Sequence, residues 1–244
     1  MADPLIIETT DLRKAYDGVE ALRGLSLQVP AGAIFGFLGR NGAGKTSTIK
    51  VLLGMSRATS GEARVFGLAA TSPDASVDIR RRTGFVSEDK DLYGYMTVDE
   101  MIRFTAPFFP RWRADLEQRY LRVFELPLER KVKALSRGMR TKLALLLALC
   151  RGADLLILDE PTSGLDPAMT EEVLQALVAH VAGEEMTVFF SSLTNPVRLR
   201  ISTLRSGAST GRPNTRASPP VGRLMPRRIF IVVVLPAPLR PRKP

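Results

Sequence analysis

The chain lacks the cysteine pairs that cross-link secreted proteins and the long apolar runs that anchor proteins in membranes. Its 244 residues include one cysteine, one tryptophan and one histidine. The lone Cys150 cannot form an internal disulfide, which favours a cytosolic location. The longest apolar runs, Leu143–Cys150 and Ile229–Leu235, fall far short of the roughly 18–20 residues that span a bilayer, so no membrane-crossing helix is expected. The first residues also lack the basic and apolar regions of a signal peptide.

Acidic residues are absent from the last part of the chain. Residues 193–244 hold 11 Arg and Lys but no Asp or Glu, which leaves 24 basic and 25 acidic residues in 1–192. The net charge of +10 therefore belongs to the tail, and it does not predict a nucleic-acid partner for the nearly neutral body. Nine of the 17 prolines also lie in the tail, a composition typical of disordered segments. Its apolar stretch 229–235 is β-prone and would be an aggregation hazard if exposed.

Strand and helix signals alternate through residues 1–192, as in a mostly parallel sheet covered by helices. The apolar patterns predict strands at Leu5–Glu8, Leu25–Val29, Ala33–Leu38, Ala63–Phe66, Thr83–Ser87, Leu155–Leu158 and Thr187–Ser191. Helices are predicted at Lys45–Leu53 and Met169–Val181, and a largely helical block runs from 97 to about 151. That block ends in Lys142–Cys150, which is apolar on nearly all sides and is therefore expected to be buried.

The most specific motif is a glycine-rich loop between a predicted strand and a predicted helix. It fits G-x-x-x-x-G-K-[ST] at every position. Its residues are Gly39, Arg40, Asn41, Gly42, Ala43, Gly44, Lys45 and Thr46. Such a loop turns successive backbone N–H groups toward a polyphosphate, while Lys45 reaches the β- and γ-phosphates and the Thr46 hydroxyl ligates Mg²⁺. The motif predicts a nucleoside triphosphate site; the alternative is a glycine-rich turn with an incidental lysine.

Two carboxylates follow the predicted buried strand Leu155–Leu158. Asp159 stands at the carboxyl end of this strand, where ligands bind to parallel sheets and where it can hold the water shell of Mg²⁺. Glu160 can orient the attacking water or accept its proton. We therefore expect Lys45 and Glu160 to be the catalytic pair. The alternative is that the carboxylates only cap the next helix.

With Leu158–Asp166 (LDEPTSGLD), these motifs make residues 5 to 192 resemble the ATP-binding subunit of a bacterial ABC transporter. The resemblance is to the exporter branch, whose permease is a separate chain. It implies an α/β P-loop NTPase fold with a parallel-sheet core, N-terminal antiparallel strands and an inserted helical subdomain at about 91–151. It also implies ATP and Mg²⁺ as ligands, a homodimer or heterodimer of ATPase subunits, and an integral membrane permease as partner. No specific nucleic acid is implied, and the location would be the inner face of the cell membrane.

The resemblance assigns further residues to the ATP site. Ser47 extends the glycine-rich loop, and Tyr16 stands where the family has the aromatic residue that stacks on adenine; a core aromatic at a strand edge is the alternative. Glu88 occupies the place of the Q-loop glutamine and joins Thr46 and Asp159 as a metal ligand. A solvated acidic loop is the alternative for Glu88.

Two segments are implied to act across the dimer. Leu135–Met139 (LSRGM) stands where the family has Leu-Ser-Gly-Gly-Gln, the signature that contacts the ATP of the opposite subunit. Ser136 and Gly138 are retained, whereas Arg137 and Met139 depart from the pattern. The D-loop, which communicates between subunits, comprises Ser163, Gly164, Leu165 and Asp166.

One family element is missing. The family has a γ-phosphate-contacting histidine after the strand 187–192, where this chain has Leu193, and we expect the only histidine, His180, to be an ordinary surface or half-buried residue. Synonymous codons for 193–200 permit a shifted frame that reads His-Gln-Ser-Gly-Glu-Val-Glu, similar to the family. We hypothesise that a frameshift after Ser192 replaced the native C-terminus. A genuine disordered tail and a basic arm for anionic lipid are the alternatives.

The sequence thus predicts an ATP-hydrolysing subunit of a membrane transporter, slowed by the lost histidine. By resemblance, the permease contact lies around Asp91–Phe109. Nearby aromatic residues offer either contact surface or core, namely Phe104, Phe108, Phe109 and Trp112. A non-transport ABC ATPase acting on DNA or ribosomes, and an inactive ATP-binding remnant, are the other functions considered.

Overall fold

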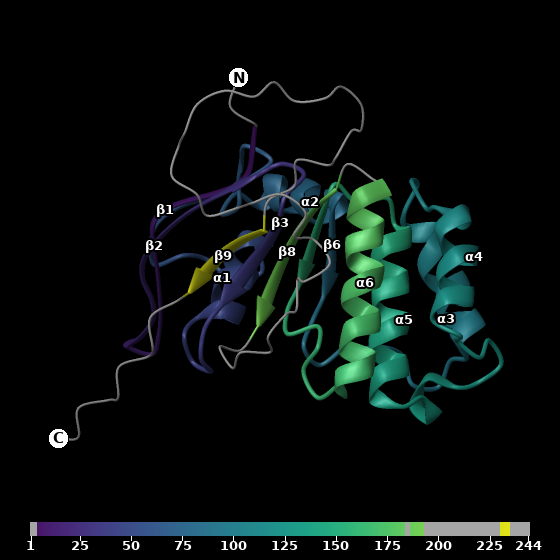
Figure 1. The fold of residues 1–244 in the computed structure, drawn as a ribbon. Coiled ribbons are helices and arrows are strands. Elements are labelled where there is room, and N and C mark those ends of the chain that lie inside the picture. Colours follow the sequence, from purple (N-terminus) through teal and green to yellow (C-terminus); the bar gives the residue numbers. More distant parts are fainter. Residues whose placement is uncertain (1–3, 184–185, 193–229, 235–244) are drawn as a thin grey trace, which may run out of the picture.

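The computed structural model describes residues 4–183, 186–192 and 230–234, which form two sheets with helices packed around them (Figure 1). The first sheet is antiparallel, with the strand order β2-β1-β4-β5. Its strands are β1 (Leu5–Tyr16), β2 (Val19–Pro30), β4 (Ser60–Val65) and β5 (Leu68–Ala69). The second sheet is parallel, with the order β6-β7-β8-β3-β9. Its strands are β3 (Ile34–Leu38), β6 (Thr83–Val86), β7 (Leu155–Leu158), β8 (Thr187–Ser192) and β9 (Phe230–Val234).

The helices lie mainly between β6 and β8 in the chain. They are α1 (Lys45–Leu52), α2 (Pro73–Arg82), α3 (Val98–Thr105), α4 (Ala114–Val123), α5 (Arg137–Cys150) and α6 (Pro167–Gly183), with short 3₁₀ turns η1 (Ala106–Phe108) and η2 (Val132–Ala134). Figure 1 shows α5 and α6 against the parallel sheet, with α3 and α4 on the far side of α5. The predicted parallel core, N-terminal antiparallel strands and inserted helical block are confirmed.

The parallel sheet is buried on both faces, which explains why its strands are almost wholly apolar. Because successive side chains point to opposite faces, each strand supplies two cores. Phe35, Ile157 and Phe189 join the core beneath the antiparallel sheet. Leu156 and Val188, one position away, join the core under the helical block.

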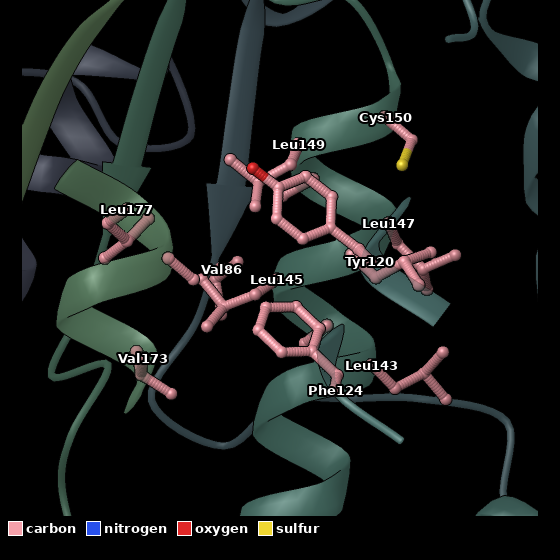
Figure 2. Packing of buried hydrophobic residues seen from close by; sticks show 14 of the residues in the cluster. Val86, Tyr120, Phe124, Leu143, Leu145, Leu147, Leu149, Cys150, Val173 and Leu177 are labelled. Atoms are coloured by element: carbon pink, nitrogen blue, oxygen red, sulfur yellow. The ribbon is translucent and has the colours of Figure 1, made fainter. Parts of the chain in front are cut away.

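In the core under the helical block, side chains of α4, α5 and α6 pack together with Val86 of β6 (Figure 2). Tyr120 and Phe124 of α4 stack with ring centroids 5.3 Å apart. They pack against the apolar length of α5, of which Leu143 and Leu145 are fully buried. The sequence Lys142–Cys150 is therefore buried, as predicted, although α5 begins five residues earlier at Arg137.

Some expectations differ from the structure. His180 is 1% exposed, so the expected surface or half-buried position is wrong; its Nδ1 lies 2.9 Å from the Tyr120 hydroxyl. The strand β5 and the helix α2 were not predicted, because β5 has two residues and α2 is mostly polar, with Ser76 and Ile79 as its buried residues. Leu5–Glu8 is only the beginning of the 12-residue strand β1.

The apolar stretch 229–235 contains β9, which pairs in parallel with β3 from Ile34↔Phe230 to Leu38↔Val234. This part of the tail is a sheet strand, in line with its β-prone sequence. Positions 193–229 and 235–244, on which the remaining expectations about the tail and the missing histidine fall, lie outside the described residues. No helix in the described part of the chain has the length and apolarity required to cross a membrane.

Because α5 is buried in the core, truncation of one of its leucines should strongly reduce the stability of the fold. Leu145 is 0% exposed and Leu128 is 39% exposed. We expect Leu145→Ala to lower the free energy of unfolding by about 2–5 kcal/mol, because it leaves a cavity. The control Leu128→Ala should cost less than about 0.5 kcal/mol. Urea denaturation measures both, and equal losses would contradict the assigned core.

Candidate functional site

The glycine-rich loop joins the carboxyl end of β3 to the first turn of α1. Gly44 has φ = 93°, a left-handed conformation that glycine adopts without strain. A side chain at this position would also clash with the carbonyl oxygen of Ala21 and with Leu22, both in β2. The loop can therefore lie against the antiparallel sheet only because this position has no Cβ.

Lys45 is the buried cation of the loop, with 6% of its surface exposed. Its Nζ donates hydrogen bonds to the carbonyl oxygens of Gly39 at 2.6 Å and Arg40 at 3.3 Å. It also lies 3.2 Å from Oε1 of Glu160. The predicted catalytic lysine and carboxylate, 115 positions apart in the sequence, therefore meet within the chain.

Asp159 and Glu160 follow β7 directly and are 3% and 7% exposed. Glu160 has φ = 48°, which is rare for a residue with a side chain. Its Oε1 has no hydrogen-bond partner among the described residues, since the contact with Lys45 lacks hydrogen-bond geometry. A buried carboxylate oxygen of this kind is an acceptor ready for a donor from outside the chain.

One polar side chain next to these carboxylates was not predicted from the sequence. Ser191, in β8, is 0% exposed. Its hydroxyl donates to Oδ1 of Asp159 at 2.6 Å and accepts the backbone N–H of Glu160 at 3.0 Å. The available signal was a serine pair ending an otherwise apolar strand, at the edge where Asp159 and Glu160 were expected.

Lys45 and Glu160 border a cavity of about 370 Å³. The residues that line it are Ala21, Asn41, Gly42, Gly44, Lys45, Thr46, Ser47, Glu88 and Glu160. The cavity therefore brings together most of the predicted loop residues with Glu88 and Glu160. Ser136 and Gly138 are not among its lining residues.

The donors around the cavity are oxygens suited to a hard cation. Thr46, Glu88 and Glu160 line it, and Asp159 lies next to Glu160. Within the described ranges, no three His, Cys, Asp or Glu side chains form a ready metal cage. This set fits Mg²⁺, which is commonly held by one or two protein groups together with substrate phosphates and water.

Glu88 is exposed, but its neighbour Lys90 is buried. The Lys90 Nζ donates to the backbone carbonyl of Glu88 at 2.8 Å. Burial lowers the pKa of Lys90 below its ordinary value, and the nearby charge of Arg137 lowers it further. This lysine therefore fixes the loop that carries Glu88 at the mouth of the cavity.

Tyr16 lies at the end of β1 with 42% of its surface exposed, so it is not a core aromatic. The Lys14 ammonium is 4.6 Å from its ring centroid. Burial acts to raise the pKa of Tyr16, but hydrogen bonding with Ser56 and Ser47 outweighs it and leaves the pKa below its ordinary value. The ring thus stands beside the start of α1, where stacking on adenine stays a prediction.

The altered signature forms the start of α5. The Ser136 hydroxyl caps this helix by accepting the N–H of Met139 at 3.2 Å. Gly138 is buried so closely against Met169 that a side chain there would clash with its sulfur. The signature is therefore packed against the first turn of α6 in the same chain.

The predicted D-loop connects β7 to α6. Its last residue, Asp166, accepts the backbone N–H of Met169 at 2.9 Å and so caps α6. A guanidinium nitrogen of Arg137 lies 3.4 Å from the Ser163 hydroxyl. The signature and the D-loop, separate in sequence, are neighbours on one side of the molecule.

The chain is similar in sequence to proteins of one family. Residues 22–163 match the family model described as ABC transporter. The bacitracin transport ATP-binding protein BcrA of Bacillus licheniformis is 37% identical over 189 residues, covering 77% of this chain and 61% of that protein. The daunorubicin/doxorubicin resistance ATP-binding protein DrrA of Streptomyces peucetius is 41% identical over 174 residues, covering 68% and 52%. The chain thus spans between half and two thirds of these relatives.

A solved structure has the same fold. It is the dimeric ATP-binding cassette MJ0796 in a post-hydrolysis state with ADP and Pi. The TM-score is 0.69 at 22% identity, covering 76% of this chain and 87% of that one. The predicted α/β P-loop NTPase fold of the ABC ATPase type is confirmed by this likeness.

The loop geometry predicts that alanine destabilises the protein to different extents at two glycines that both have a positive φ. Gly18 has φ = 81° and open space around it, unlike Gly44. Gly18→Ala should lower the free energy of unfolding by about 1–2 kcal/mol through backbone strain alone. Gly44→Ala should lower it by about 1–3 kcal/mol more, because its Cβ must displace β2. Thermal or urea unfolding of both variants measures the difference; an equal effect would argue against the close approach.

Proposed function

Because the chain belongs to the ABC transporter family, we propose that it is an ATP-binding and ATP-hydrolysing subunit that powers a membrane transporter. The observation that carries the proposal is the meeting of Lys45 with Glu160 beside a cavity lined by the glycine-rich loop. A cation for phosphate and a carboxylate for water are two of the groups by which a protein supports phosphoryl transfer to water.

Lys45 and the backbone of the loop would hold the β- and γ-phosphates of ATP. The pair that Lys45 now forms with Glu160 is buried, so binding of an anion offers the ammonium a stronger partner in a site of low polarity. Glu160 would then orient the attacking water and accept its proton. Its Oε1, which has no hydrogen bond within the described chain, is the natural acceptor for that water.

Thr46 and Asp159 would hold Mg²⁺ or its water shell, with Glu88 as a third oxygen donor. When bound, the ion supplies positive charge that stabilises the phosphate oxygens. Thr46 and Glu88 line the cavity, and Asp159 accepts a hydrogen bond from the Ser191 hydroxyl. The residues of the chain therefore orient the nucleotide and the water, while the ion neutralises charge.

A second ATPase subunit would complete the site. In the proposed dimer, Ser136 and Gly138 of one subunit contact the ATP bound to the loop of the other. This proposal is supported by two features: the helix start at Ser136 is exposed, and it lies outside the cavity of its own chain. Closure of the two subunits on ATP would drive the permease, and hydrolysis would separate them.

The helical block supplies the surface proposed for the permease. Tyr93, Tyr95, Phe104 and Phe108 are exposed by 42–67%. Their rings form a chain with successive centroids 5.4–5.8 Å apart. An exposed aromatic surface suits an apolar partner segment. Phe109 and Trp112 are half-buried, so they contribute less of this surface.

The proposed location is the inner face of the cell membrane, through that permease. Export is the direction favoured by a relative whose name refers to drug resistance. Because Leu193 stands where the family has a histidine, we expect this chain to bind ATP well and to hydrolyse it slowly.

Lys45→Ala tests the phosphate site. We expect at least about tenfold weaker ATP binding, since a charge-assisted contact to phosphate is lost. A titration with a fluorescent ATP analogue measures the affinity, and Lys133→Ala, an exposed lysine outside the cavity, is the control. Unchanged affinity in Lys45→Ala would remove the loop from the proposed site.

Glu160→Gln tests the catalytic carboxylate separately. The amide cannot accept the proton of water, so turnover should fall by about 100-fold or more while ATP binding is kept. Phosphate release and nucleotide binding are measured in parallel, with Glu171→Gln on the exposed face of α6 as control. Undiminished hydrolysis in Glu160→Gln would refute the assigned role.

A further inference from the structure

Ser191 connects two carboxylate residues that act on different parts of the proposed reaction. It lies in β8, directly beside β7, which ends one residue before Asp159. Its hydroxyl donates to Oδ1 of Asp159 at 2.6 Å and accepts the N–H of Glu160 at 3.0 Å. All three residues are at least nine-tenths buried, so water competes little for these bonds.

The direction of each hydrogen bond is fixed by chemistry. A backbone N–H can only donate, and an ionised carboxylate can only accept. The single hydroxyl proton of Ser191 must therefore point to Asp159, while an oxygen lone pair faces Glu160. One side chain thereby holds the carboxylate of Asp159 by one of its oxygens and holds the backbone of Glu160 in its left-handed conformation, φ = 48°.

We propose that Ser191 is a positioning residue that orients Asp159 and Glu160 toward the Mg²⁺-nucleotide. The proposal rests on the function proposed above. Because Oδ1 already accepts the Ser191 hydroxyl proton, the carboxylate plane of Asp159 is fixed and Oδ2 is the less engaged oxygen for Mg²⁺ or its water. Because the N–H of Glu160 is engaged as well, the side chain leaves the backbone in the direction of Lys45 and the cavity.

The same strand provides a matched control. The hydroxyl of Thr187, at the other end of β8, accepts the N–H of Gly32 at 2.8 Å and is also buried, with 1% exposed. It ties β8 to the residues before β3, and Thr187 does not line the nucleotide cavity. Loss of either hydroxyl removes a buried hydrogen-bond partner from β8, but only the loss at Ser191 releases Asp159 and Glu160.

The experiment compares Ser191→Ala and Thr187→Val in the full chain. The affinity for ATP is first measured without free Mg²⁺, by titrating ATP in the presence of EDTA. ATP is then held at a fixed concentration, and its binding is followed as Mg²⁺ is increased. We expect Ser191→Ala to change Mg²⁺-free ATP affinity by less than about twofold but to raise the half-saturating Mg²⁺ concentration by about tenfold, the effect of losing a hydrogen bond to a charged group. Thr187→Val should lower the melting temperature and leave the Mg²⁺ dependence unchanged. Ser191→Thr, which keeps the hydroxyl, should retain most of the Mg²⁺ response.

The outcomes separate this inference from the proposed function. If the unmodified chain binds Mg²⁺-ATP and Ser191→Ala has the same Mg²⁺ dependence as Thr187→Val, the positioning role is overturned while the ATP site stands. If the unmodified chain binds no ATP, the proposed function and the positioning role both fall. Should Ser191→Ala lose cooperative unfolding, Ser191→Cys replaces it, and an unchanged Mg²⁺ dependence in that variant overturns the role equally.

Discussion

The parallel pairing of β7, β8 and β3 in one register is the constraint on which the site depends. Leu38 is opposite Ser192, and Leu158 is opposite Phe190, so the strands end near the same edge. The glycine-rich loop leaves this edge from β3, and Asp159 leaves it from β7. If the pairing of β3 or β8 were shifted by one residue, Phe35 or Phe189 would point away from its core. Burial of the apolar side chains therefore also fixes the positions of the polar ones.

Charged groups are buried at this edge of the sheet, and their burial does not stabilise the fold. Lys45 and Glu160 are buried as an ion pair, and the desolvation of such a pair offsets much of its attraction. Glu160 also has an unusual backbone conformation, and its Oε1 makes no hydrogen bond within the described chain. Strain and missing hydrogen bonds of this kind gather where a ligand will supply the partner. The extensive apolar cores on both faces of the sheet keep this arrangement folded.

Features with a local signal were predictable from the sequence, whereas those set by tertiary partners were not. β7 is a run of four apolar residues and was predicted with its observed bounds, and the glycine-rich loop is specific by itself. The burial of His180 depends on Tyr120 of another helix, and no pattern near either residue reveals it. Ser191 was taken only as the end of a strand, because its importance comes from Asp159, 32 positions away. The polar α2 was missed since its one buried face is too narrow for a periodic signal.

The altered signature shows how such tertiary partners can accommodate a departure from the family pattern. A glycine is expected at position 137, and an arginine there could have disturbed the start of α5. The helix nevertheless begins with the Ser136 cap in place, because the Arg137 side chain extends away to the D-loop, beside Ser163 and Gly164. Gly164 is exposed and has φ = 69°, and its missing side chain leaves the space that the guanidinium occupies. The retained residues Ser136 and Gly138 can thus keep their backbone geometry, while the substituted residue links the signature to the D-loop.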